Sequence, residues 1–426
     1  MSLMRIDDLF HFEKGILQSS KCTEGQFDFI TASSEWKTHN EYTHDCEALV
    51  FAAAASGSLG RTHYVNGKFI SSDLCFIITA KDPIKLPIDL KFYHMIFNEF
   101  KNDIVNSTKA GTSKEAIGMK AFGNYKLPYF DIDKQIVTKV QFVNMQHSKV
   151  ELNVELTHQL DLIKQMRQAF LHEAMQGKLL KSTSTKETGQ QLLTKIKAEK
   201  AKLIAEKKLK KENELTPITD DEIPFEIPKH WVWCKLGEVV SMSRGKFSIR
   251  PRNDPSYFGG EYPFIQIGSL DEKGSVINEA PQTLNEKGLK VSKEFPEKTI
   301  VIAIVGGTIA NLGVLGRKMC FTDSIVGIYP LNWYNQDYVL NFLKYKQPEI
   351  KQSSYQMAGQ PNIKIPTLEN LAYPLPPFHE QEQIVAKLDE LMAFCDGLEQ
   401  SIKESQGYNE MLLQQVLREA LQGEKV

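Results

Sequence analysis

The stretch LPYFDIDKQIV at residues 127–137 returns later in the chain as LPPFHEQEQIV at residues 375–385. Six of the eleven aligned positions are identical. Self-similarity at a fixed spacing indicates that one structural unit occurs twice in a chain. The two stretches therefore predict an internal repeat with one such stretch in each copy.

The repeat extends to both sides of these stretches. The shared positions are mostly apolar residues or glycines, whereas the polar residues between them differ. This pattern is expected if two copies of one fold kept a common core and bind different ligands. The matching pairs are Gly111 with Gly359, residues 173–177 with 419–423 after a slip of two residues, residues 6–15 with 236–245, residues 29–30 with 264–265, residues 59–61 with 315–317, and the apolar runs after Asp73 and Asp323.

Each copy has a region of short apolar runs followed by a region with a helical period. Runs bounded by Gly, Asp or Ser predict strands at residues 48–54, 74–79, 299–305 and 325–329. After each Leu-Pro pair, apolar residues follow a 4-3-4-3-4 spacing, which predicts a long amphipathic helix. The predicted stripes are Ile136, Val140, Val143, His147, Val150 and Val154 in the first copy and Ile384, Leu388, Leu391, Cys395, Leu398 and Ile402 in the second.

A helix of about forty residues is about 60 Å long. One small domain cannot cover such a stripe, so each helix needs a partner helix, and the obvious partner is the other copy. The alternative is that each helix lies on its own domain. We predict an α+β fold in which two mixed α/β domains are joined by two long antiparallel coiled-coil helices with an internal pseudo-twofold repeat. The predicted boundaries are 1–130 for the first domain, 131–212 for the central helical region and connector, 213–375 for the second domain and 376–426 for the C-terminal helix.

Composition and charge narrow the functional classes. With 426 residues, 42% of them hydrophobic, the chain can bury the cores of two or three domains. It has no run of about 18 apolar residues and no charged-then-apolar leader, so we expect a cytoplasmic protein without a membrane partner. The net charge of -2 argues against a uniformly basic, non-specific nucleic-acid binder but leaves room for local basic patches.

The sequence predicts no catalytic residue and no metal ligand. Residues 376–378 are similar to the Pro-Pro-aromatic element of amino-methyltransferases, but Leu375 stands where those enzymes need a hydrogen-bonding Asn, Asp or Ser. A helix-entry turn is the better interpretation. His39, His44 and Cys46 lack the second paired element of a zinc site, so a polar loop is favoured there. We find no GxSxG or HExxH motif and no compact carboxylate-lysine cluster of a nuclease.

The helical regions resemble those of the specificity subunits of type I restriction-modification systems. The resemblance covers essentially the full length and is weaker inside the domains. The first domain departs from the pattern, because it starts directly at residues 3–6 without an Ile-Pro-x-x-Trp lead-in. The residues that carry the resemblance are 375–385 with Leu388 and Asp389, 420–423, 168–171 with 177–179, 197–203, and 227–233 with 236–238.

The resemblance implies a DNA-recognition subunit without catalytic activity of its own. Each domain would be a target recognition domain that reads one half of a bipartite sequence in double-stranded DNA, and the paired helices would set the gap. Two methylation subunits would dock on the helices and domains, and motor-nuclease subunits would join for restriction. The chain itself would bind no cofactor, since S-adenosylmethionine, ATP and Mg²⁺ would belong to these partners.

DNA reading requires polar and basic side chains on exposed loops. Arg244, Lys246, Arg250 and Arg252 fall within nine residues that include no acid, which predicts a positive loop. The DNA-binding candidates in the second domain are Arg244, Lys246, Arg250, Arg252, Gln266, Ser269, Arg317, Gln360, Asn362 and Lys364. The weaker candidates in the first domain are Lys14, Ser33, Ser34, Lys37, Arg61, His63, Thr112, Ser113 and Lys114.

Two other functions remain open from the sequence. The repeat and the helices alone would suit an interaction protein with two binding heads on a coiled-coil stalk and no DNA ligand. A methyltransferase acting alone would instead bind S-adenosylmethionine as an isolated chain.

Overall fold

The computed structural model describes residues 2–54, 57–110, 115–180, 187–209, 215–329, 331–332, 334–355 and 362–422. The chain divides into two compact units, which we call unit 1 (Met1–Gln159 with Ser401–Val426) and unit 2 (Leu160–Gln400). Each unit contains strands and helices, so the predicted mixed α+β class is confirmed. The two longest helices, α5 (Ile132–Met175) and α11 (Phe378–Gln422), contribute residues to both units.

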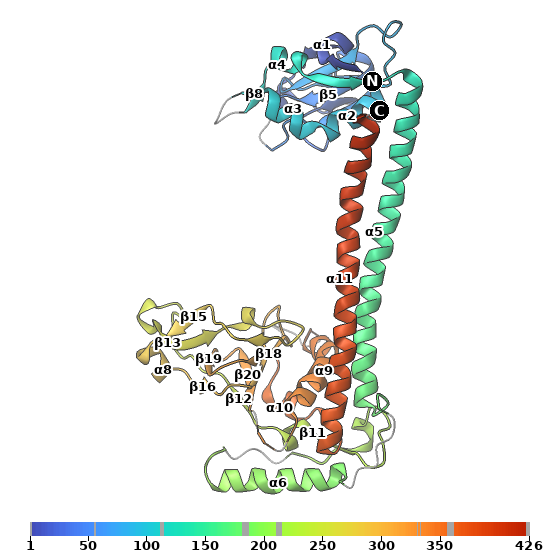
Figure 1. Ribbon diagram of the computed structural model, residues 1–426. Helices are drawn as coiled ribbons and strands as arrows, with labels where there is room; N and C mark the ends of the chain where they lie inside the picture. Colours follow the sequence, from blue (N-terminus) through green and yellow to red (C-terminus); the bar gives the residue numbers. More distant parts are fainter. Residues whose placement is uncertain are drawn as a thin grey trace. The chain divides into compact units, whose positions relative to one another are not determined.

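Short strands and helices alternate in each unit (Figure 1). Unit 1 has β1 (Ser2–Arg5), α1 (Ile6–Leu9), β2 (Phe10–Lys14), β3 (Phe27–Ile30), β4 (Lys37–His39), β5 (His44–Ala52), β6 (Thr62–Ser71), β7 (Cys75–Ala80), α2 (Leu90–Glu99), α3 (Lys101–Thr108), β8 (Lys109–Ala110), β9 (Ala116–Ile117), α4 (Met119–Asn124) and β10 (Lys126–Tyr129). Unit 2 has α6 (Gly189–Ala205), β11 (Val232–Lys235), α7 (Leu236–Val239), β12 (Met242–Arg244), β13 (Phe258–Ile265), β14 (Val276–Ile277), β15 (Gln282–Leu284), α8 (Glu286–Lys290), β16 (Glu294–Phe295), β17 (Ile300–Ala303), β18 (Leu312–Leu315), β19 (Met319–Phe321), β20 (Ile325–Ile328), α9 (Gln336–Tyr355), α10 (Ile365–Glu369) and β21 (Ala372–Leu375).

The sheets of the two units share a strand order. In unit 1 the order is β2-β7-β5-β6-β3-β4, and in unit 2 the strands β12-β20-β17-β18 repeat its first four places. The four strands predicted from apolar runs are confirmed as β5, β7, β17 and β20. The long β6 corresponds to β18 and β19 together, because β3 pairs in parallel with β6 as β13 does with β19. Residues 316–318 interrupt this strand in unit 2.

The first elements of both units also correspond. Strand β1 pairs with β10 as β11 pairs with β21, and α1 and α7 follow directly. Gly15 and Gly245 then occupy the same crowded place, since a Cβ atom would collide with the carbonyl oxygen of Ser72 in one unit and of Thr322 in the other. The predicted match of residues 6–15 with 236–245 is therefore confirmed, and the first domain has its entry strand despite the missing lead-in.

A buried glutamine fixes the entry of each long helix. The Gln135 Oε1 atom accepts from the backbone N–H of Asp89 at 2.8 Å, and its Nε2 donates to the Phe130 carbonyl at 2.7 Å. In unit 2, Gln381 Oε1 accepts from the N–H of Asn335 at 3.2 Å, and its Nε2 donates to the Pro376 carbonyl at 3.0 Å. Both glutamines are completely buried. The two helix entries are thus built by the same hydrogen bonds.

These contacts correct the alignment of the repeat by two residues. Gln135 and Gln381 are 246 positions apart, as are Pro128 and Pro374, whose carbonyls each accept from a tyrosine hydroxyl at 3.1 Å. The Leu-Pro match at residues 127–137 and 375–385 has a spacing of 248 and is structurally out of step. The slip of two residues at 173–177 and 419–423 agrees with the spacing of 246 at the helix entries.

This shift of two residues in the alignment also explains why the stripe predicted for α5 is wrong. The stripe of α11 is buried where it packs in unit 2, at Ile384, Leu388 and Cys395. In α5, Ile136, Val140, Val143, Val150 and Val154 are between 44% and 66% exposed. The packed positions of α5 in unit 1 lie 246 before the α11 stripe and include buried Thr138 and Leu156 and half-buried Phe142, Met145 and Lys149.

A second correction concerns the turn that follows β5 in unit 1 and β17 in unit 2. The predicted match of residues 59–61 with 315–317 is wrong, because the N–H of Gly60 bonds to Ala52 as the N–H of Ala310 bonds to Ala303. Both Gly60 and Ala310 have positive φ angles, 81° and 65°. Arg61 therefore corresponds to Asn311, and Arg317 lies elsewhere, in the interruption between β18 and β19.

The long helices contact each other within each unit. In unit 1, Asn409 Nδ2 donates to Asn153 Oδ1 at 3.0 Å and to the Lys149 carbonyl at 3.2 Å, and the segments of α5 and α11 lie side by side (Figure 1). In unit 2, Arg167 forms ion pairs with Asp396 at 2.5 Å and Glu399 at 2.7 Å. None of the helices in the described part of the chain combines the length and apolar character of a membrane span.

We predict that Gln135→Leu destabilises the helix entry of unit 1. Leucine is similar in size but leaves the buried N–H of Asp89 without an acceptor, which costs about 1–3 kcal/mol. Hydrogen exchange of the full chain, read by mass spectrometry, should show faster exchange of peptides that contain residues 89–99. Gln141→Leu, on the exposed side of the same helix, is the control. Equal exchange in both variants would contradict a structural role for this amide.

Candidate nucleic-acid interface

Three segments of unit 2, two of which carry predicted residues, meet at the end of strand β17. The N–H of Ile304 donates to the Ser324 carbonyl at 3.0 Å, and the N–H of Ile363 donates to the Ile304 carbonyl at 2.9 Å. Asn311, in the turn after β17, donates from Nδ2 to the Leu270 carbonyl at 3.2 Å. The segments around residues 324, 363 and 270 are therefore held together at the end of β17, a central strand of the sheet.

The predicted positive loop is partly neutralised by an acid from another segment. Arg252 forms an ion pair with Asp323 at 2.6 Å, and Arg244 Nε donates to the backbone carbonyl of the same residue. Arg250 folds back to donate to the Ile249 carbonyl at 2.8 Å. Lys246 is exposed. The structure thus brings Arg244 and Arg252 together at Asp323, a residue outside the predicted loop, whose carboxylate pairs with Arg252.

Lys293 is a basic residue of this region that the sequence analysis missed. Its Nζ atom donates to Ser243 Oγ at 2.6 Å and lies 4.7 Å from the ring centre of Phe295. The residue is 49 positions away from Arg244 along the chain, so local charge counting could not place it there. An aromatic ring under an ammonium group adds a cation–π attraction that holds its position.

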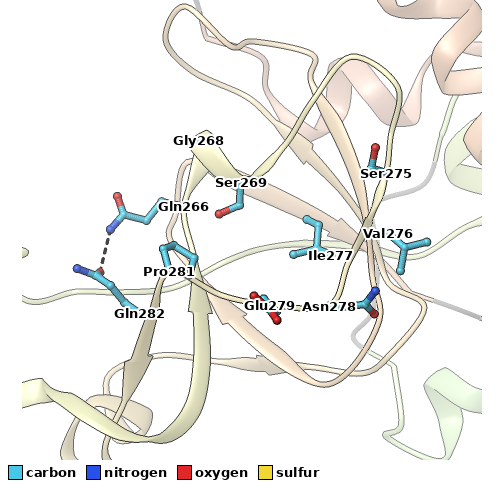
Figure 2. A pocket seen from close by; sticks show the side chains of 10 residues that line it. All are labelled: Gln266, Gly268, Ser269, Ser275, Val276, Ile277, Asn278, Glu279, Pro281 and Gln282. Atoms are coloured by element: carbon cyan, nitrogen blue, oxygen red, sulfur yellow. Dashed lines mark hydrogen bonds between the residues drawn. The ribbon is translucent and has the colours of Figure 1, made fainter. Parts of the chain in front are cut away.

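The remaining candidates of unit 2 lie on separate loops. Gln266 and Ser269 line an open hollow of about 770 Å³, and Figure 2 shows the side chains of Gln266 and Gln282 facing each other at one side of it. Arg317 is exposed in the interruption between β18 and β19. Asn362 bridges to Val305 through its backbone, and Lys364 is exposed just before α10. Gln360 lies outside the described residues.

The hollow also contains residues that the sequence analysis did not single out. Gln282 and Asn278 are exposed on its wall, and Gln266 Nε2 donates to Gln282 Oε1 at 3.2 Å. Neither residue belongs to a motif, and the ladder that places Gln282 opposite Phe264 forms only in the folded sheet.

In unit 1, four predicted residues gather around the loop 31–36. Arg61 Nη1 donates to the Ala32 carbonyl at 3.0 Å, and Ser33 and Ser34 are exposed on the loop. Trp36, which the sequence analysis missed, donates from Nε1 to His63 Nδ1 at 3.3 Å. An aromatic residue within the polar run of residues 33–37 was the available signal for this indole.

The environment of His63 favours the neutral form of its ring. Burial lowers the pKa of its imidazole below the ordinary value of 6.5, and the charge of Arg61 acts in the same direction, against a hydrogen bond from the ring to the backbone of Ser33. A neutral imidazole has one nitrogen that accepts, which suits the hydrogen bond from Trp36. The indole and imidazole can therefore form a fixed polar and aromatic surface on this loop.

The other candidates of the first domain are not part of this group. Lys37 is exposed at the start of β4, and Lys14 is exposed on β2 at the opposite edge of the sheet. Thr112, Ser113 and Lys114 lie outside the described residues, as do Gly111 and Gly359 of the predicted repeat.

The predicted polar loop around His39, His44 and Cys46 is wrong. His39 lies in β4, and His44 and Cys46 lie in β5, where antiparallel pairing with β6 holds them. Within the described ranges, no three His, Cys, Asp or Glu side chains gather as a metal site would require.

Comparisons with known proteins agree with this arrangement. The sequence pattern of the type I restriction modification DNA specificity domain matches residues 1–156 and 228–405. The EcoAI specificity subunit of a type I restriction enzyme of Escherichia coli is 30% identical over 275 residues, which cover 60% of this chain and 44% of that subunit. The EcoDI subunit of the same species is 22% identical over 426 residues, with 99% and 88% covered. The match to the EcoEI specificity subunit of Escherichia coli covers 43% of that subunit. The chain therefore spans less than half the length of the EcoAI and EcoEI subunits.

Two solved structures share the fold. The HsdS subunit from Thermoanaerobacter tengcongensis superposes with a TM-score of 0.58 at 16% identity, covering 99% of this chain and 96% of that chain. A chain from a study of complex assembly and conformational transition of the type I R-M system superposes with a TM-score of 0.64 at 15% identity, covering 99% and 97%. With the domain pattern matched in both halves, the chain belongs to the family of the type I restriction modification DNA specificity domain.

Proposed function

We propose that this chain is the DNA sequence-recognition subunit of a type I restriction-modification complex and that it is not itself catalytic. The observation that carries the proposal is the repeated scaffold of this family, whose polar loops differ between the two copies at matching places. The loop 31–36 carries Ser33, Trp36 and the neighbouring His63, whereas the loop 266–281 carries amides. Two scaffolds with different polar loops suit the reading of two different half-sites.

The proposed domains follow from this role. Residues 1–130 and 213–375 would be the target recognition domains, and residues 131–212 and 376–426 would form the spacer and connector. We propose that α5 and α11 pair as an antiparallel coiled coil related by a pseudo-twofold repeat. The contacts of Asn409 with Asn153 and of Arg167 with Asp396 and Glu399 support this pairing. A rigid pair of helices would fix the gap between the half-sites.

The partners would supply the chemistry. Two methylation subunits would transfer methyl groups from S-adenosylmethionine to adenine, and motor-nuclease subunits using ATP and Mg²⁺ would join for restriction. All of them would act in the cytoplasm on double-stranded DNA with a bipartite sequence. The DNA contacts are proposed for the candidate residues of both units, with Trp36 and Lys293 added.

The exposed valines of α5 suit the docking of a methylation subunit. Val140 and Val143 line a hollow of about 870 Å³ together with helix α2, and Lys91 and Lys139 lie at the same hollow. The stripe continues along the helix through Val150 and Val154. The corresponding positions of α11 are polar or small, so the apolar stripe exists in one copy of the repeat. They are Glu382, Ala386, Asp389, Asp396 and Gln400.

We predict that this chain, expressed with its methylation partner, directs N6-methyladenine to a bipartite motif. Replacing residues 1–126 by the domain of another family member should change one half-site, because only one recognition domain is exchanged. Lengthening both long helices in step should change the gap and keep both half-sites. Sequencing of the methylome measures all three outcomes. A continuous motif, or methylation that persists after deletion of the chain, would rule out the proposed role.

We also predict that the double variant Val143→Asp, Val150→Asp binds the methylation subunit at least about tenfold more weakly. Burying one valine stabilises a contact by roughly 1.5 kcal/mol, and an unpaired carboxylate in an apolar contact costs more. Titration calorimetry of the full chain with the purified partner measures the change. The control carries the same charges on exposed positions of another face, Gln141→Asp and Ser148→Asp. Equal affinities would place the docking surface elsewhere.

A further inference from the structure

The hairpin loop at residues 266–281 gives unit 2 a surface that unit 1 lacks. It joins β13 to β15, as the loop 31–36 joins β3 to β4, and it has sixteen residues where the other has six. The ladders match, since Phe29 lies opposite Lys37 and Phe264 lies opposite Gln282. Gln282 therefore stands where unit 1 has Lys37, one of the predicted DNA contacts. Unit 2 therefore differs from unit 1 at this place of the shared sheet in two ways, by a longer loop and by Gln282 in place of Lys37.

The frame of this loop is anchored to the sheet. The backbones of Asp271 and Leu312 exchange two hydrogen bonds, at 3.1 and 2.8 Å, and the N–H of Val314 donates to the Ser275 carbonyl at 3.0 Å. The Asp271 carboxylate also accepts from the backbone N–H of Ser275 at 3.1 Å. These contacts hold the loop on β18, so its side chains project from a rigid support, as specific recognition requires.

The chemistry of the hollow suits an uncharged base edge. Its described lining includes three carboxamides, from Gln266, Asn278 and Gln282, and one carboxylate, from Glu279, and it contains no lysine or arginine. The positive charges of Arg317 and Lys318 are exposed in the neighbouring turn, which the hydrogen bond from Gly316 N–H to the Ile277 carbonyl joins to the hollow at 2.9 Å. Basic groups beside a hollow that has a carboxylate and no cation would place phosphates on the turn and bases over the amides.

The hydrogen bond between Gln266 and Gln282 leaves Gln266 with one donor and one acceptor, the pair of groups that recognises adenine. Gln266 gives one N–H to Gln282 Oε1 at 3.2 Å, which fixes the plane of its amide (Figure 2). Its second N–H and its Oε1 stay available. A glutamine in this state pairs with adenine, whose N7 accepts and whose N6 donates in the major groove. Guanine offers two acceptors there, N7 and O6, and one of them would face Oε1.

We propose that Gln266 reads an adenine in the half-site bound by unit 2 and that Gln282 is the residue that positions it. The proposal rests on the proposed function and adds to it the base and the side chains. Gln266 is the specificity-determining residue because it touches the base. Gln282 acts through the hydrogen bond to Gln266 and through no contact of its own with the base.

The test compares methylomes of cells that express the full chain or its variants with the methylation partner. The exchange of residues 1–126 identifies which half-site belongs to unit 2. Gln266→Ala should lower the preference for adenine at one position of that half-site by roughly 5- to 150-fold, the range for loss of one bidentate contact. The other half-site and the gap should stay as they are. Gln266→Glu keeps the size of the side chain but loses the donor to N7, so it should also lose the adenine.

Variants of Gln282 test whether this residue orients the Gln266 amide through its hydrogen bond or only fills space beside it. Gln282→Glu keeps the acceptor oxygen and should keep the preference for adenine, whereas Gln282→Ala should weaken it. Gln352→Ala, an exposed glutamine on α9, is the matched control and should leave the motif unchanged.

Two results would overturn the proposal without touching the proposed function. They are a bipartite motif whose unit 2 half-site contains no adenine, and a motif unchanged by both Gln266 variants. Equal motifs from Gln282→Ala and the unaltered chain would remove Gln282 from the assignment. A continuous motif from the unaltered chain would overturn both the assignment and the proposed function, so the two failures are distinguishable.

Discussion

The buried amides of Gln135 and Gln381 are the contacts on which both halves of the chain depend. Each amide lies in the first turn of a long helix and binds one backbone N–H and one backbone carbonyl of the domain that precedes the helix. A buried backbone N–H without a partner is costly, so the side chain at this place must offer both an acceptor and a donor. This requirement fixes how each long helix leaves the strands and helices of its own unit.

A shared scaffold then carries two different polar surfaces. Gly15 and Gly245 allow the same close approach, and the turns at Gly60 and Ala310 repeat the same backbone path. On this scaffold, Arg61 holds the loop at Ala32, while Asn311 holds the loop at Leu270. The anchors serve the same purpose, and the loops that they anchor differ in length and chemistry. These differences between the loops leave the shared core intact.

Much of the fold could be predicted from the sequence, but the packed face of one long helix could not. The strands at residues 48–54 and 325–329 and both long helices follow from period and turn residues, which act locally. The packed face of α5 could not be found this way, because an accidental Leu-Pro match set the spacing to 248. Valines at 140, 143 and 150 look like a core stripe in sequence, yet the packed face is displaced by two residues and lies about 160° around the helix from them.

By itself, the sequence determined that the chain is a repeat of a mixed domain and a long helix, and the helix-entry residues were enough to indicate the family. These features are set by neighbours along the chain, through apolar period, glycine and proline. Only the tertiary structure decided which side chains share a surface. Asp323 meets Arg252 from a distance of 71 residues, Trp36 meets His63, and Gln266 meets Gln282, since sheet pairing joins segments that no local pattern relates.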